Sequence, residues 1–188
     1  MKTAFIALVV LTLIGCSKPT PEEAMQRAEQ LLAQARTAAD TVSSPDQLAS
    51  VFAPGIEAMQ GVADSYPGTP EAERALFSVA ATYNNESQEF QKAIDAYHRY
   101  VSVYPEGEKA AVAMFLIGYI YNNQLGNVDS ARAAYQRFLE KYPQHEMAVS
   151  AQFELNNLGK SPEELLPPPP PETKKPQVAY LNKREKLM

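Results

Sequence analysis

Two stretches of this 188-residue chain decide its fold: ALFSVAATYNN at residues 75–85 and AMFLIGYIYNN at residues 113–123. The second begins 38 residues after the first, and alanine, phenylalanine and Tyr-Asn-Asn recur at matching places. The dipeptide Tyr-Pro recurs at the same interval, at residues 66–67, 104–105 and 142–143. A sequence that repeats itself with a period of about 20–50 residues indicates stacked structural units.

The spacing of apolar residues predicts that each unit is a pair of helices. The expected first helices cover 70–84, 108–123 and 146–158, and the expected second helices cover 88–103 and 127–141. Each Tyr-Pro pair ends a helix, because the residue before a proline disfavours helical geometry. A lone helical hairpin cannot bury its apolar face, so we expect neighbouring hairpins to stack into an all-α solenoid.

Two further helices are expected ahead of the repeats, over 21–42 and over 45–65, the second interrupted near Pro54-Gly55. Thr20, Ser44 and Thr69 each precede a proline and are predicted helix N-caps, since a hydroxyl there accepts an orphan backbone N–H. The Ser161-Pro162-Glu163-Glu164 stretch has the same form. We therefore interpret 21–65 as a divergent first hairpin and 66–160 as the regular repeats.

The repeats resemble tetratricopeptide repeats. Gly118 and Tyr121 match the small residue and the aromatic residue of that motif's first helix, and Ala131, Tyr135 and Pro143 match its second helix and closing proline. The resemblance implies an α-solenoid that binds other proteins. The period here is 38 residues, whereas the usual one is about 34; longer units are familiar in tetratricopeptide proteins of bacterial envelopes.

The N-terminus has the pattern of an export signal. Lys2 is followed by an apolar run at residues 4–14, too short to cross a bilayer as a helix but typical of a secretory signal. The run ends in Leu13-Ile14-Gly15-Cys16, which resembles a bacterial lipobox. That resemblance implies a signal peptide over 1–15, a lipidated linker over 16–20, and diacylglycerol plus an N-acyl chain (palmitate) on Cys16. The alternative is an ordinary signal peptide with a chance cysteine.

Composition argues against several other functions. The formal charge is −5, with a single cysteine and two histidines, so nothing favours nucleic-acid binding, an internal disulfide or a cysteine-based metal site. No phosphate-binding loop, zinc-protease motif or nucleophile elbow occurs in the sequence. We therefore predict no catalytic residue, no metal, no cofactor beyond the lipid, and no enzymatic activity. A lipid-anchored enzyme or solute-binding lipoprotein would need a polar pocket that the sequence does not indicate.

Partner binding is the better hypothesis. The first helices of a tetratricopeptide array line its concave face, where aromatic rings and amides suit an extended peptide. The alternatives are that the phenylalanines belong to the core and that the asparagines are helix C-caps. The candidate groove residues are Arg74, Phe77, Asn84, Phe115, Tyr119, Asn122, Asn123, Phe153 and Asn157.

A lipobox joined to a short tetratricopeptide array resembles the BamD-type lipoproteins of outer-membrane protein assembly. Ser17, in place of the aspartate that favours inner-membrane retention, implies the periplasmic face of the outer membrane. The repeat is equally similar to the C-terminal domain of the Tol-Pal-associated coordinator of cell-wall synthesis, so a cell-division or cell-wall adaptor is the alternative. Residues 161–188 contain five consecutive prolines and are expected to be a disordered or semi-rigid basic tail. This tail either solubilises the chain or touches anionic lipid, the cell wall or an acidic partner.

Replacing the lipobox cysteine tests the anchor. Cys16→Ser should leave an unlipidated, uncleaved precursor, because the thiol is the group that receives the lipid. Metabolic labelling with palmitate and the electrophoretic mobility of the chain measure both effects. Normal labelling and cleavage of the Cys16→Ser chain would contradict the lipobox interpretation.

Overall fold

The computed structural model describes residues 18–160 and residue 164. The predicted signal peptide at 1–15, the lipidation site Cys16, and the tail at 161–163 and 165–188 lie outside the described residues. Within the described part, every regular element is an α-helix. These are α1 (Pro21–Ala39), α2 (Pro45–Ser65), α3 (Pro70–Asn85), α4 (Phe90–Val103), α5 (Ala110–Asn123), α6 (Val128–Lys141) and α7 (Ala148–Asn157).

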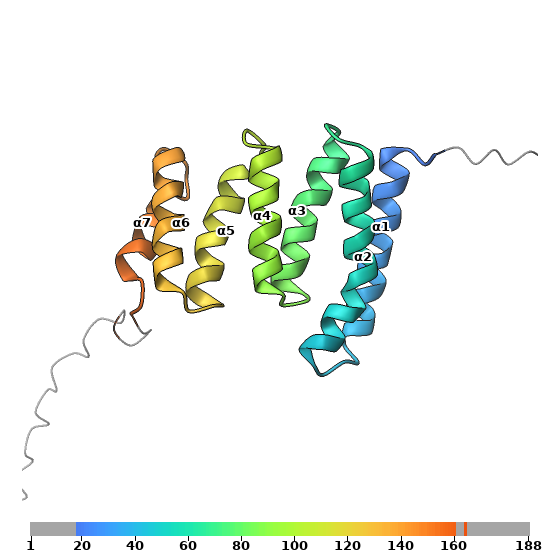
Figure 1. Ribbon diagram of the computed structural model, residues 1–188, viewed down its shortest axis with the longest axis horizontal. Helices are drawn as coiled ribbons and strands as arrows, with labels where there is room; N and C mark the ends of the chain where they lie inside the picture. The colour runs from blue at the N-terminus through green and yellow to red at the C-terminus, as the bar shows by residue number, and fades with distance from the viewer. Residues whose placement is uncertain (1–17, 161–163, 165–188) are drawn as a thin grey trace, which may run out of the picture.

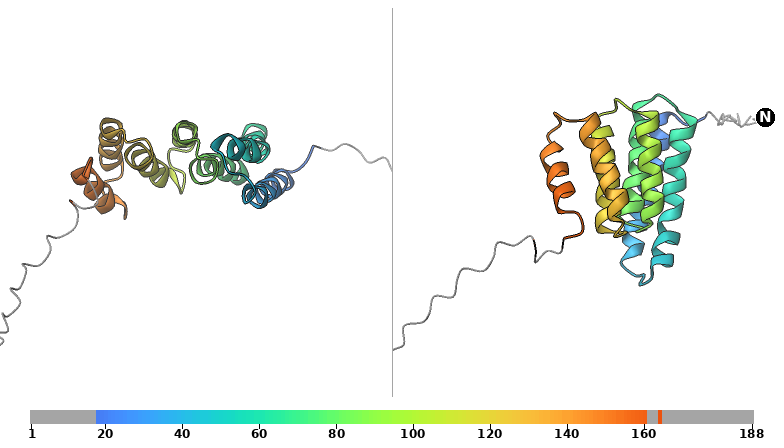
Figure 2. Two further views of the ribbon diagram at one scale, coloured as in Figure 1. Left: turned by 90° about the horizontal axis from the view of Figure 1, so that it is seen from below. Right: turned by 60° about the vertical axis from the view of Figure 1, so that its left-hand side comes forward.

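The helices stand side by side in chain order, and each turns back along its predecessor (Figure 1). Seen along their axes they form two rows (Figure 2, left). The helix-A row contains α1, α3, α5 and α7, and the helix-B row contains α2, α4 and α6. This arrangement confirms the predicted all-α solenoid of stacked hairpins.

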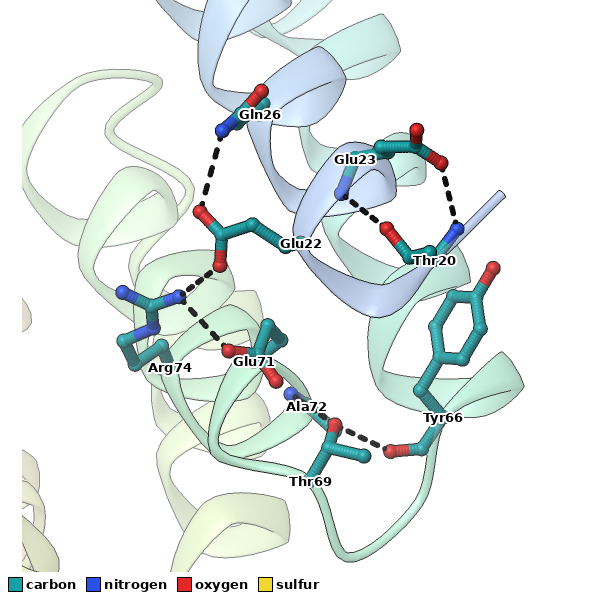
Figure 3. A network of polar contacts seen from close by, with 9 residues as sticks. All are labelled: Thr20, Glu22, Glu23, Gln26, Tyr66, Thr69, Glu71, Ala72 and Arg74. Carbon is teal, nitrogen blue, oxygen red and sulfur yellow. Dashed lines mark hydrogen bonds and ion pairs between the residues drawn. The ribbon is translucent and has the colours of Figure 1, made fainter.

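Side-chain caps fix where the N-terminal helices begin. The Thr20 hydroxyl accepts the backbone N–H of Glu23, whose carboxylate accepts the N–H of Thr20, so a complete capping box starts α1 (Figure 3). The hydroxyls of Ser44 and Thr69 accept backbone N–H groups at the starts of α2 and α3. The N-caps predicted at these three residues are therefore confirmed.

Two boundary predictions in the first hairpin were wrong. Helix α1 ends at Ala39, three residues earlier than expected, and α2 continues through Pro54 and Gly55 without interruption. A proline inside a helix leaves the carbonyl four residues earlier without its N–H partner. Here that residue is Ser50, which is exposed, so water can satisfy its carbonyl.

Position 55 of α2 is a glycine because α1 and α2 approach each other closely at this point. A Cβ at this position would lie 2.5 Å from Leu32 Cδ2 and 3.1 Å from the Leu32 backbone nitrogen. Gly55 is the counterpart of Ala93 and Ala131 in the later units, each 38 residues further on and fully buried. The first hairpin therefore keeps the close helix contact of the repeats.

Aromatic packing joins the two helices of each later unit. The Phe77 ring of α3 packs edge-on against Tyr97 and Tyr100 of α4, with centroids 5.6 and 5.5 Å away. Phe115 of α5 makes the equivalent contacts in the next unit, at 5.5 and 6.0 Å, with Tyr135 and Phe138. Each such contact contributes about 0.5–1.5 kcal/mol beyond the burial of the rings.

The surroundings of the second-helix aromatic residue differ between the two units. The Tyr100 hydroxyl donates to the Glu73 carboxylate at 2.6 Å, and Gly107 leaves the space, since a Cβ there would lie 2.4 Å from that carboxylate. Burial, followed by this hydrogen bond, raises the pKa of Tyr100, so the phenol stays neutral. In the next unit, Phe138 replaces Tyr100 and has no hydroxyl, and Ala111 replaces Glu73 and has no carboxylate. His145 replaces Gly107, and its ring packs against Phe138.

Two glycines of α2 give a matched test of this packing. Gly55→Ala should destabilise the protein by about 1–3 kcal/mol, because the added methyl overlaps Leu32. Gly61→Ala should stabilise it by about 0.5–1 kcal/mol, because nothing lies within 4 Å of the added Cβ and alanine favours a helix. Chemical denaturation followed by circular dichroism measures both. Equal effects of the two substitutions would contradict the close contact at Gly55.

Candidate functional site

A hollow of about 400 Å³ lies between the C-terminal ends of α3 and α5. We call it the helix-A pocket. Its lining is mostly amide and aromatic: Asn84, Asn85, Gln88, Phe90, Tyr119 and Gln124. Tyr119 is 37% exposed, so its ring is available at the surface. Amide groups that bond a backbone, next to a ring that covers a side chain, suit a polypeptide ligand.

Asn84 contributes polar groups to the helix-A pocket. Its side-chain amide donates to Asn85 Oδ1 at 2.7 Å. Its own Oδ1 is buried and has no hydrogen-bond partner among the described residues. A buried acceptor without a partner costs about 1–3 kcal/mol, so a ligand N–H or a water at this place would stabilise the site.

Gln88 marks this pocket as unusual. Its backbone φ is +57°, the left-handed region that L residues other than glycine seldom adopt. The equivalent residue one unit later is Gly126, with φ +61°. The turn between α5 and α6 therefore has glycine at this position, whereas the turn between α3 and α4 has a strained glutamine at the rim of the pocket. Such strain concentrates at functional sites.

The remaining predicted groove residues lie away from the helix-A pocket. Arg74 is tied to Glu22 of α1 and to Glu71, at 3.4 and 3.3 Å (Figure 3). Phe77 is half-buried and Phe115 is buried, both against the aromatic rings of their own units. Asn123 and Asn157 donate to the carbonyls four residues earlier, at the ends of α5 and α7. Asn122 is half-buried near the end of α5.

Phe153 differs from its two equivalents because no described helix follows α7. Its side chain is 56% exposed, and Val149 is 80% exposed, whereas the equivalent Phe115 and Ala111 are 9% and 5% exposed. The structure therefore brings Asn84 and Tyr119 together, and leaves Phe153 on a separate, open face. The predicted groove residues do not form one continuous surface.

Four residues of the helix-A pocket were not predicted: Asn85, Gln88, Phe90 and Gln124. Asn85 repeats as Asn123, so the period could have suggested it. Gln88 carries a weaker signal, the replacement of a turn glycine by glutamine between two otherwise similar units. Phe90 and Gln124 enter the pocket through the tertiary arrangement of α4 and α5, which periodicity does not specify.

No helix in the described residues has both the length and the apolarity needed to cross a bilayer. Within the same residues, no group of three histidine, cysteine or acidic side chains is arranged to hold a metal ion.

Comparison with protein-family models identifies the repeats. Residues 74–107 and 112–145 each match the tetratricopeptide repeat. The matched segments begin 38 residues apart, as the sequence period requires. The chain thus contains two tetratricopeptide repeats, and these repeats indicate a protein–protein interaction scaffold. A search of curated proteins gave no match to this chain.

Replacing Gln88 with glycine should change the stability of the protein and its ligand binding in opposite directions. Gln88→Gly should raise the free energy of unfolding by about 1 kcal/mol, because glycine adopts positive φ without a Cβ penalty. It should also weaken binding of a ligand held by the Gln88 amide. Denaturant midpoints of the Gln88→Gly and wild-type chains measure the first effect, and an unchanged or lower midpoint would argue against strain.

Proposed function

We propose that this protein is a scaffold tethered to the outer membrane through Cys16, which holds extended segments of other envelope proteins in the helix-A pocket. One observation carries the proposal: the strained Gln88 lines the same hollow as Tyr119 and as Asn84, whose buried Oδ1 has no hydrogen-bond partner among the described residues. The tetratricopeptide architecture supports binding to protein rather than to another class of ligand.

Contacts next to the proposed anchor support a short tether. The Lys18 ammonium lies 4.9 Å from the centre of the Tyr66 ring and bonds the Ser65 carbonyl at 3.4 Å. The Tyr66 hydroxyl donates to the Pro19 carbonyl. The chain is thus fixed to α2 from residue 18, two residues after Cys16. Two residues span at most about 7 Å, so a lipid on Cys16 would keep the solenoid close to the bilayer.

The helix-A pocket lies at the far end of α3 from this attachment. Residue 18 and the start of α3 meet near Tyr66, whereas the pocket includes the last residues of α3. A helix of 16 residues is about 24 Å long at 1.5 Å per residue. The pocket would therefore open about one helix length from the lipid, where a periplasmic segment can reach it.

The resemblance to BamD-type lipoproteins supports outer-membrane protein assembly as the setting. Adaptor work in cell division or cell-wall synthesis is the second setting that the repeat resembles. The pocket would use the same chemistry in both settings, because in each it would hold a polypeptide by hydrogen bonds to its backbone. The identity of the captured protein separates them.

Photo-crosslinking in native envelopes tests the proposal. A benzoylphenylalanine at position 124, an exposed rim residue, should yield a specific crosslinked product; one at Gln30, exposed on α1, should not. Tyr119→Ala should reduce the product several-fold, because it removes the ring that covers the ligand. Mass spectrometry of the product distinguishes barrel-assembly proteins from Tol-Pal or cell-wall partners. Identical products from positions 124 and 30 would refute a binding site here.

A further inference from the structure

The opposite face of the array carries two hollows that are copies of each other. The α4–α6 pocket has a volume of about 280 Å³, and the α2–α4 pocket about 250 Å³. Each lies between neighbouring helix-B elements, with the intervening helix A as its floor. All eight residues that line the α2–α4 pocket have their counterpart, 38 residues later, in the lining of the α4–α6 pocket.

The floors of the two pockets are alike. Leu76, Val79 and Tyr83 of α3 become Met114, Ile117 and Tyr121 of α5. Both floors are apolar with one phenol, and each volume fits a single bulky side chain rather than a drug-sized ligand, which needs about 300–1,000 Å³. The floor therefore provides an apolar seat in both units.

The rims differ in charge. Lys92, Asp95 and Arg99 surround the α2–α4 pocket, whereas Ser130, Ala133 and Arg137 hold those places in the α4–α6 pocket. Arg137 is thus the one permanently charged side chain in the lining of the α4–α6 pocket, as the described residues define it.

The two arginines also differ in their partners. Arg99 is paired with Asp64 of α2. The residue equivalent to Asp64 in the next unit is Ser102, which has no carboxylate. Arg137 accordingly makes no hydrogen bond or ion pair within residues 18–160. Partial burial and the positive charge of Arg137 lower the pKa of His98, so the histidine beside it is neutral at pH 7 and does not compete for an anion.

We propose that the α4–α6 pocket is a second docking site, which takes a partner protein segment carrying a bulky apolar side chain next to a carboxylate. The apolar side chain would fill the seat on Met114 and Ile117. The carboxylate would accept hydrogen bonds from the Arg137 guanidinium, which takes carboxylates in a bidentate geometry. The α2–α4 pocket would not compete for this segment, because its arginine, Arg99, is already paired with Asp64.

A substitution that copies the carboxylate of one unit into the next unit tests the proposal. Ser102→Asp transfers the Asp64 carboxylate to the equivalent place and should capture Arg137; Ser102→Asn is the matched neutral control. Ser102 is exposed on α4, so both variants should keep the fold, which circular dichroism checks. The full chain, purified in detergent, is titrated against a fluorescein-labelled peptide with a central phenylalanine flanked by glutamates, and anisotropy is recorded.

The wild-type and Ser102→Asn chains should bind this peptide with similar affinity. Ser102→Asp and Arg137→Gln should each bind about tenfold more weakly, as loss of one charge-assisted contact predicts. A peptide with glutamines in place of the glutamates should bind the wild type equally weakly. Tyr119→Ala, in the helix-A pocket, should leave this affinity unchanged, so the two sites fail or succeed independently.

Four results would overturn the proposal. The first three are no saturable rise in anisotropy with the wild type, equal affinities for Ser102→Asp and Ser102→Asn, and equal affinities for the glutamate and glutamine peptides. A loss of binding in Tyr119→Ala would also do so, because it would assign the peptide to the helix-A pocket.

Discussion

The architecture depends on one constraint: a helix of 10–21 residues, the range among the described helices, has to bury a face against a partner to be stable. The partners approach closely where one of them is small. A Cβ at Gly118 would lie 2.8 Å from the Tyr135 ring, and the equivalent Ala80 is fully buried in the unit before. This contact holds the two helices of one unit together, and because the units repeat every 38 residues, a hollow on one unit recurs on the next.

Stacked copies of one unit make copies of one surface, and the differences between copies give each surface its role. Arg99 and Arg137 occupy the same place, but only the first has a carboxylate partner. Gln88 and Gly126 share a backbone conformation, but only the first carries a side chain into a pocket. The two faces of the array would thus hold different partners, one by backbone hydrogen bonds and one by an apolar seat with a charged rim. If the proposed lipid anchor and envelope partners hold, such a scaffold would bring two envelope proteins together.

The fold could be predicted from the sequence because the period, the caps and the Tyr-Pro pairs are local or repetitive signals. The continuity of α2 through Pro54 could not, because it depends on the exposure of Ser50 and on the contact of Gly55 with Leu32. Of the residues that line the helix-A pocket, Asn84 and Tyr119 are among the predicted groove residues, and their binding role stays a prediction. The α2–α4 and α4–α6 pockets were missed because the apolar residues of their floors have ordinary helical spacing. The lack of a partner for Arg137 among the described residues becomes evident only when the two units are superimposed. The role of Cys16 stays a prediction, as it lies outside the described residues.

The most direct test of the central claim, that pairing within a hairpin is what stabilises each helix, is native-state hydrogen exchange of the full chain. Equivalent backbone amides of α5 and α7 lie 38 residues apart and form a matched comparison. We predict that the amides of α7 are protected from exchange at least about a hundredfold less than those of α5. The reason is that Phe153 and Val149 are exposed, whereas Phe115 and Ala111 are buried. Equal protection of the two helices would contradict it.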